Sequence, residues 1–197
     1  THSDSPTMTV SNSSKEEIES FFPNAKGKIY NGYQTIDDFF TSSSQAESAE
    51  IKKIFDVQPN SYFIFFGSLD PKKNIGRLIE AFLMSATDRK LVIVGAMGWK
   101  NEAELRFMQR GIDLQSIIYV DYLPARLLVA MLKNARALLF PSIAEGFGLP
   151  VLEAFTAGVP VMCSREGGLA EVASDAALIV NAYDVQSIVI GINALDK

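Results

Sequence analysis

The chain has 197 residues, of which 48% are hydrophobic and 21% are charged, as in an ordinary folded globular protein. This length fits one domain with an appendage better than two complete domains. The net charge of −5 comes without a dense basic cluster, which argues against nucleic acid as a partner. No run approaches the roughly 18 apolar residues of a spanning helix, so we expect membrane contact only through a part of the protein outside this chain.

The first 50 residues are rich in Ser, Thr, Asn, Asp and Glu. Residues 7–10 predict one short strand, and Ser11 or Ser13 could cap a helix that ends at Phe22. Residues 28–30 predict a second short strand before an Asn-Gly turn, and residues 42–44 a solvated loop or linker.

From residue 61 onward, short apolar runs closed by Gly, Pro or Asp alternate with helical patterns. Runs of this kind are typical of parallel strands that are buried on both faces. We therefore predict an α/β fold over residues 51–197, a doubly wound Rossmann-like parallel sheet of about six strands. The last apolar pattern, from Val185 to Leu195, suits a helix that the chain leaves unfinished, so we expect the domain to be truncated there. The predicted strands are 61–66, 90–94, 117–120, 137–140, 159–162 and 177–180, and the predicted helices between them are 75–85, 102–111, 125–134, 150–157 and 169–173.

In such sheets, ligands sit at the carboxyl ends of the strands, so the loops that follow the strands are the candidate sites. The loop after residue 66 carries Gly67, which lets backbone approach a ligand closely, and two lysines beside the start of a helix. Lys73 could donate a charge-assisted hydrogen bond to a diphosphate. The alternative is a polar turn with solvated lysines.

The loop from Pro141 carries Glu145 and the run Gly-Phe-Gly-Leu-Pro, which feeds a helix. Pro150 suits the first turn of that helix, and the free amides around Gly148 and Leu149 would face an anion or a hydroxyl. Glu153 lies about one turn further along an otherwise apolar helix. The alternative is that both carboxylates only cap the helix or face solvent.

Glu145 and Glu153 are separated by seven residues, which resembles the E-x7-E signature of retaining GT-B glycosyltransferases of family 4. The Asn-Gly pair at residues 31–32, the loop 67–74 with its Gly-x-Leu-x-Pro-x-Lys-Asn pattern, residues 158–161 and the Gly-Gly pair at 167–168 resemble other motifs of that family in the same order. The resemblance covers the chain from about residue 7. It implies that residues 1–50 are the tail of a missing N-terminal domain plus the hinge, and that residues 51–197 form the C-terminal, donor-binding domain.

The resemblance also implies roles for single residues. Glu145 would be the catalytic residue and would contact the donor sugar, and Glu153 would accept hydrogen bonds from the ribose hydroxyls. Tyr122, in the segment 119–123, would border the nucleobase. Family members usually need no metal, so no metal or cofactor is expected, and the lysine and helix amides would stabilise the leaving diphosphate. The implied donor-binding residues are Gly67, Ser68, Lys73, Tyr122, Glu145, Gly146, Phe147, Gly148, Leu149 and Glu153.

The implied activity is transfer of a hexose from a GDP- or UDP-linked donor, with GDP-mannose favoured, in the synthesis of cell-surface polysaccharide or glycolipid. The missing domain would supply the acceptor site, so we expect this chain alone to be inactive. We expect a cytoplasmic protein, at most peripheral at the membrane face.

Ser68 stands where many members have Arg, and Asp121 where a Gly is frequent. These departures favour an alternative, a catalytically dead interaction domain, and a GT-B nucleotide-sugar epimerase is a further one.

Overall fold

The computed structural model describes residues 5–96, 98 and 102–197, and its main element is a six-stranded sheet. All strands are parallel, in the order β5-β4-β3-β6-β7-β8. Every residue of the central strand β3 is buried, as expected for a strand covered on both faces. The α/β prediction is therefore confirmed. The strands are β3 (Tyr62–Phe66), β4 (Lys90–Val94), β5 (Ile117–Val120), β6 (Leu138–Phe140), β7 (Val161–Cys163) and β8 (Leu178–Ile179).

The chain reverses its direction of travel across the sheet between β3 and β6. From β3 it runs outward through β4 to β5, and it then returns to the other side of β3 and continues through β6 and β7 to β8. The loops that follow β3 and β6 therefore lie next to each other at the carboxyl edge. In open α/β sheets this reversal creates a crevice in which ligands bind.

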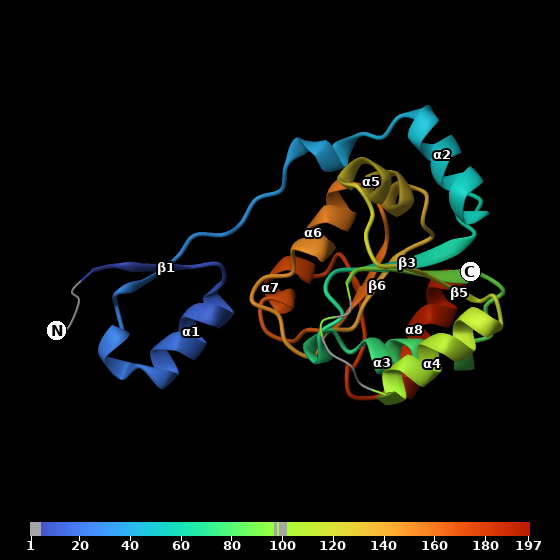
Figure 1. Ribbon diagram of the computed structural model, residues 1–197. Coiled ribbons are helices and arrows are strands. Elements are labelled where there is room, and N and C mark those ends of the chain that lie inside the picture. The colour runs from blue at the N-terminus through green and yellow to red at the C-terminus, as the bar shows by residue number, and fades with distance from the viewer. Residues whose placement is uncertain (1–4, 97, 99–101) are drawn as a thin grey trace.

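Helices cover both faces of the sheet (Figure 1). One face carries α2, α5 and α6, and the other carries α3, α4 and α8, while the short helix α7 packs beside α6. These helices, the sheet and the loops that join them form what we call the sheet unit, residues 45–197. The helices are α2 (Gln45–Phe55), α3 (Ile75–Met84), α4 (Glu102–Asp113), α5 (Ala125–Lys133), α6 (Leu149–Thr156), α7 (Leu169–Ala173) and α8 (Val185–Asp196), with a 3-10 turn η3 (Pro71–Lys73) before α3.

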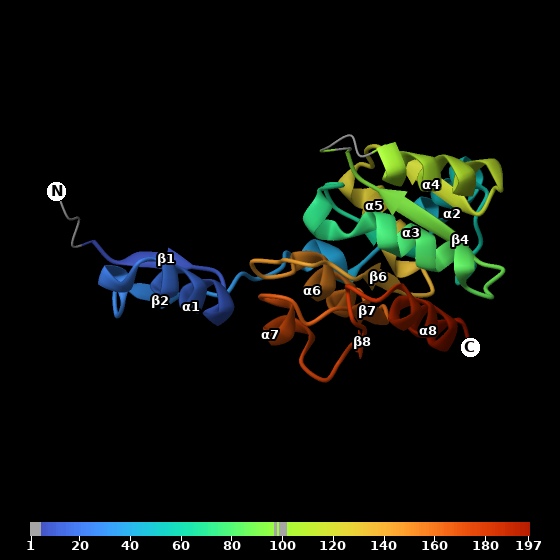
Figure 2. The ribbon, with the colours of Figure 1, turned by 90° about the horizontal axis from the view of Figure 1, so that it is seen from below.

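The N-terminal module, residues 5–33, stands to one side of the sheet unit in both views (Figures 1 and 2). Its strands β1 (Thr7–Thr9) and β2 (Ile29–Asn31) pair in parallel, with α1 (Asn12–Phe21) and η1 (Pro23–Ala25) between them. Ser11 caps α1, since its side chain accepts a hydrogen bond from the Ser14 N–H. The segment that follows includes the 3-10 turn η2 (Asp38–Thr41) and leads to α2.

Helix α2 was not predicted, although its sequence carries a start signal. Ser44 and Glu47 form a capping box, in which each side chain bonds the other residue's backbone N–H. The domain boundary expected after residue 50 falls inside α2, whose Ile51 is buried in the core of the sheet unit. Residues 45–50 therefore lie with the sheet unit. Within the described residues, no helix is long and apolar enough to cross a membrane.

Candidate functional site

Two glycines bring the loops after β3 and β4 into close contact. Gly67 and Gly95 adopt φ values of 135° and 150°. A Cβ atom on Gly95 would lie 1.8 Å from the Gly67 carbonyl oxygen. Only glycine fits this position, because every other residue would place that carbon inside the neighbouring backbone. The backbone after β3 is thereby held at the carboxyl edge of the sheet.

An ion pair joins the two neighbouring loops, between Lys73 in the loop after β3 and Glu145 in the loop after β6. The Lys73 Nζ lies 2.5 Å from the Glu145 Oε1, and the two side chains are only 11% and 8% exposed. The same ammonium lies 5.1 Å from the centroid of the Phe140 ring, a favourable cation–π contact. Lys73 is therefore not a solvated lysine, whereas its neighbour Lys72 is exposed.

Asn74 fixes the end of the loop after β3 through two hydrogen bonds of its side chain. Its side-chain amide donates to the backbone oxygens of Pro141 at 2.9 Å and Ala182 at 2.7 Å. The residue is buried and has a left-handed φ of 61°, which asparagine tolerates better than most residues. Asn74 thus joins the β3 loop to the β6 loop and holds Lys73 near Glu145.

The start of α6 leaves backbone N–H groups free. Gly148, with a φ of 106°, precedes the helix, and Pro150 occupies its first turn. The Val151 and Leu152 N–H groups both bond the Gly148 oxygen. Among the described residues, nothing accepts from the N–H groups of Gly148 and Leu149. These two groups and the helix dipole favour an anion or a hydroxyl oxygen.

Glu153 lies one turn into α6 and is half-buried. Burial raises the pKa of its carboxyl group to about 7. No other described side chain pairs with this carboxylate. A half-buried, unpaired carboxyl group can accept hydrogen bonds from the hydroxyls of a ligand, which would replace the water that burial removes.

The loop between β7 and α7 packs its backbone against the backbone of Glu145 and Gly146. The Gly168 N–H donates to the backbone carbonyl oxygen of Glu145 at 2.8 Å. A Cβ on Gly167 would lie 2.3 Å from that oxygen, and one on Gly168 would lie 2.4 Å from the Gly146 oxygen. The Gly-Gly pair thus lets two loops stack backbone on backbone, which fixes the position of residues 145–147.

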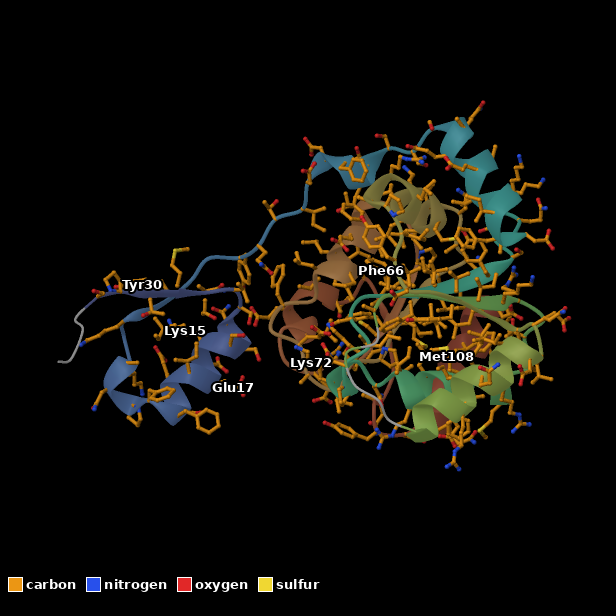
Figure 3. All side chains as sticks on the ribbon, in the orientation of Figure 1. Lys15, Glu17, Tyr30, Phe66, Lys72 and Met108 are labelled. Atoms are coloured by element: carbon orange, nitrogen blue, oxygen red, sulfur yellow. The ribbon has the colours of Figure 1, made fainter. Side chains whose placement is uncertain are left out.

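A cavity of about 390 Å³ opens between the N-terminal module and these loops. In Figure 3, Glu17 lies on the side of α1 that faces the sheet unit, and Lys72 lies on the side of the sheet unit that faces α1. Glu145 forms part of the wall, so the buried ion pair borders the cavity. Its lining residues are Ser13, Glu17, Lys72, Ile143, Ala144, Glu145, Gly146 and Gly167.

The structure brings most of the residues singled out in the sequence to this edge, but Ser68 bonds a residue of its own loop and Tyr122 lies apart from the ion pair. Ser68 donates a hydrogen bond to the Asp70 carboxylate at 2.6 Å. Tyr122 is 77% exposed and follows β5, two strands away from β3. Sequence reasoning missed Ser13 and Glu17, because only the docking of α1 places them at the cavity. No group of three or more His, Cys, Asp or Glu side chains in the described residues could hold a metal ion.

Comparisons with known proteins agree with this architecture. The chain is 31% identical over 185 residues to the O-antigen chain mannosyltransferase B of Escherichia coli, covering 92% of this chain and 49% of that protein. The crystal structure of Anabaena HepE in complex with UDP and glucose matches with a TM-score of 0.80 at 18% identity, over 96% of this chain and 53% of that one. A glycosyltransferase from Rickettsia africae matches with a TM-score of 0.85 at 15% identity, over 97% and 53%.

The chain therefore spans about half the length of the relatives it matches. The sequence model described as glycosyl transferases group 1 matches residues 47–196. The expected resemblance to the C-terminal domain of a GT-B glycosyltransferase is confirmed. This chain belongs to the glycosyl transferases group 1 family.

Proposed function

We propose that this chain is the donor-binding half of a retaining mannosyltransferase that uses GDP-mannose in the synthesis of cell-surface polysaccharide or glycolipid. The observation that carries the proposal is the buried pair of Lys73 and Glu145, beside the free N–H groups of α6, where the sheet reverses. Mannose is favoured by the E. coli relative, whose name is O-antigen chain mannosyltransferase B. We place the whole protein in the cytoplasm, at the membrane face where such acceptors would be reached.

Lys73 and the start of α6 would hold the donor diphosphate. An ammonium group has three N–H donors, and Glu145 takes one of those of Lys73. The remaining donors, with the N–H groups of Gly148 and Leu149, are available to phosphate oxygens. As the bond from the sugar to the diphosphate breaks, negative charge grows on the leaving group, and fixed donors in a buried site stabilise it most at that moment. This arrangement supplies positive charge without a metal ion.

Glu145 would hold the donor sugar. One of its oxygens bonds Lys73, and the other can accept from a hydroxyl of a hexose in the neighbouring cavity. Glu145 accepts the hydrogen bond in its pair with Lys73. Glu153 would accept from the ribose hydroxyls, and Tyr122 would flank the base. The acceptor would come from the part of the protein outside this chain.

One observation favours a second candidate, an interaction domain that has lost the donor. Where many family members have an arginine on the phosphates, Ser68 instead bonds the carboxylate of Asp70. The Asp70 carboxylate would repel a diphosphate, and Ser68 lacks the positive charge that an arginine would bring to this loop. In that case Lys73 and Glu145 would be only a structural pair.

A transfer assay with the whole protein tests the proposal. We expect labelled mannose to move from GDP-mannose to a lipid-linked or oligosaccharide acceptor, with the anomeric configuration of the donor kept in the product. The Glu145→Gln protein should fold and lose most of the activity, and this chain alone should transfer nothing. An inverted product would refute the retaining mechanism, and full activity in Glu145→Gln would refute the role of that residue.

A further inference from the structure

Among the described residues, the side chain of Glu171, on the short helix α7 of the sheet unit, forms hydrogen bonds only with the N-terminal module. Its Oε1 accepts from the Ser13 N–H at 2.7 Å, and its Oε2 accepts from the Asn12 N–H at 3.0 Å. The Tyr33 hydroxyl also donates to Oε2, at 2.9 Å. Both oxygens of one carboxylate are therefore used on residues more than a hundred positions away in the chain.

These contacts complete the first turn of α1. A helix leaves its first N–H groups without partners inside the helix, and Ser11 satisfies that of Ser14. The Glu171 carboxylate satisfies those of Asn12 and Ser13. A negative charge at this end also complements the helix dipole. The module thus presents the positive end of α1 to one carboxylate of the sheet unit.

Tyr33 extends the contact to the other side of the Asn-Gly turn. The Asn12 side-chain amide donates to its hydroxyl at 2.8 Å, which links the start of α1 to the segment after β2. Burial alone would raise the pKa of the Glu171 carboxyl group, but the hydrogen bonds from Ser13, Asn12 and Tyr33 outweigh it and lower the pKa. Glu171 is therefore charged at neutral pH, as the contact requires.

The same surface of the module touches the Glu145 loop. The Ser14 hydroxyl donates to the Gly146 oxygen at 3.2 Å, and the Tyr33 and Phe147 rings lie 5.9 Å apart. Ser13, bound to Glu171 through its backbone, is also part of the cavity wall. The position of α1 therefore determines how far the cavity beside Glu145 is open.

We propose that Glu171 is a positioning residue, which anchors the start of α1 and Tyr33 and so sets the gap between the N-terminal module and the Glu145 loop. The contact is a latch between the two units. Its importance for sugar transfer rests on the proposed function, whereas the latch itself does not.

The latch can be tested on this chain without any ligand. Spin labels at Lys26→Cys in the module and Lys52→Cys on α2 report the distance between the two units, since both positions are exposed. The only native cysteine, Cys163, is fully buried and will resist labelling. The distance distribution is recorded in the parent, in Glu171→Gln, in Tyr33→Phe, and in Asp175→Asn as the control. Asp175 is an exposed carboxylate just beyond α7.

We expect one narrow distance in the parent and in Asp175→Asn. In Glu171→Gln the distribution should broaden, and protease cleavage of the segment 34–43 should become about tenfold faster, because charge-assisted hydrogen bonds are the strong ones. Tyr33→Phe should give a smaller change in the same direction, because it removes one hydrogen bond and keeps the ring beside Phe147. Unchanged distributions in both variants would overturn the proposal.

Nucleotide titration of the same proteins tests the proposed function independently of the latch. A lack of binding by the parent would count against the proposed function and would leave the latch in place.

Discussion

At the scale of single residues, the proposed function depends on the pair of Lys73 and Glu145. Each of these two buried charges is stabilised by the other. We predict that Lys73→Met lowers the free energy of unfolding by about 3 kcal/mol, since it leaves a buried carboxylate without its partner. Lys72→Met is the matched control, because Lys72 is the exposed neighbour in the same turn. Urea unfolding measures both.

The double variant Lys73→Met, Glu145→Gln separates the pair from other effects of the substitution. Removing both charges should restore a large part of the lost stability, because no isolated charge then remains. If the double variant were as unstable as the sum of the two single variants, the two side chains would act independently and the pair would have no coupling.

Glu153 gives a prediction for pH at the same scale. Burial raises its pKa in the folded chain from the ordinary value of 4.5 to about 7, so the folded state binds more protons than the unfolded state between these pH values. Stability from this group is therefore fully present below pH 4.5 and is lost as the pH rises through 7. The change should be on the order of 1 kcal/mol, because solvent screens a half-buried carboxylate.

The contribution of Glu153 is isolated by comparing the parent with Glu153→Gln at several pH values. The stability of the variant relative to the parent should increase from pH 4.5 to pH 8, since the variant has no proton to lose. A difference that stays constant over this range would contradict the raised pKa.

At the scale of elements, the stacked loops 145–147 and 167–168 make the site rigid. We predict that Gly168→Ala lowers the free energy of unfolding by about 1–3 kcal/mol, as overpacking does, because its Cβ would lie 2.4 Å from the Gly146 oxygen. Gly146→Ala is the control, since its Cβ would meet nothing nearer than 3.8 Å. Thermal unfolding of the two variants should differ clearly, and equal midpoints would show that the loops can separate without loss.

The elements also show what the sequence could and could not reveal. The strands and helices of the sheet unit were predictable, because short apolar runs and helical patterns alternate along it. The capping box of Ser44 and Glu47 is a signal in the sequence for the start of α2. The backbone contact between the Gly-Gly pair and Glu145 was not readable, since it joins two loops whose order in space depends on the whole sheet.

For the whole molecule, topology explains why the candidate site could be located but not completed from the sequence. Loops that follow parallel strands share one edge, so Lys73 and Glu145 could be placed on that edge, and the order β4-β3-β6 makes them neighbours. The docking of the N-terminal module depends on Glu171 and Tyr33, which are 138 positions apart and carry no shared pattern. No periodicity in the sequence reports such a contact.

In the proposed function, the edge between β3 and β6 holds a nucleoside diphosphate through Lys73. Calorimetric titration of this chain with GDP, UDP and ADP, and of the Lys73→Met and Lys72→Met variants, tests it most directly. We expect selective binding of one nucleotide, with GDP favoured. Its affinity should fall about tenfold or more in Lys73→Met, since a hydrogen bond to a charged group contributes roughly 1.5–3 kcal/mol, and change little in Lys72→Met. Binding of no nucleotide, or equal affinity in the parent and in a folded Lys73→Met chain, would contradict the account.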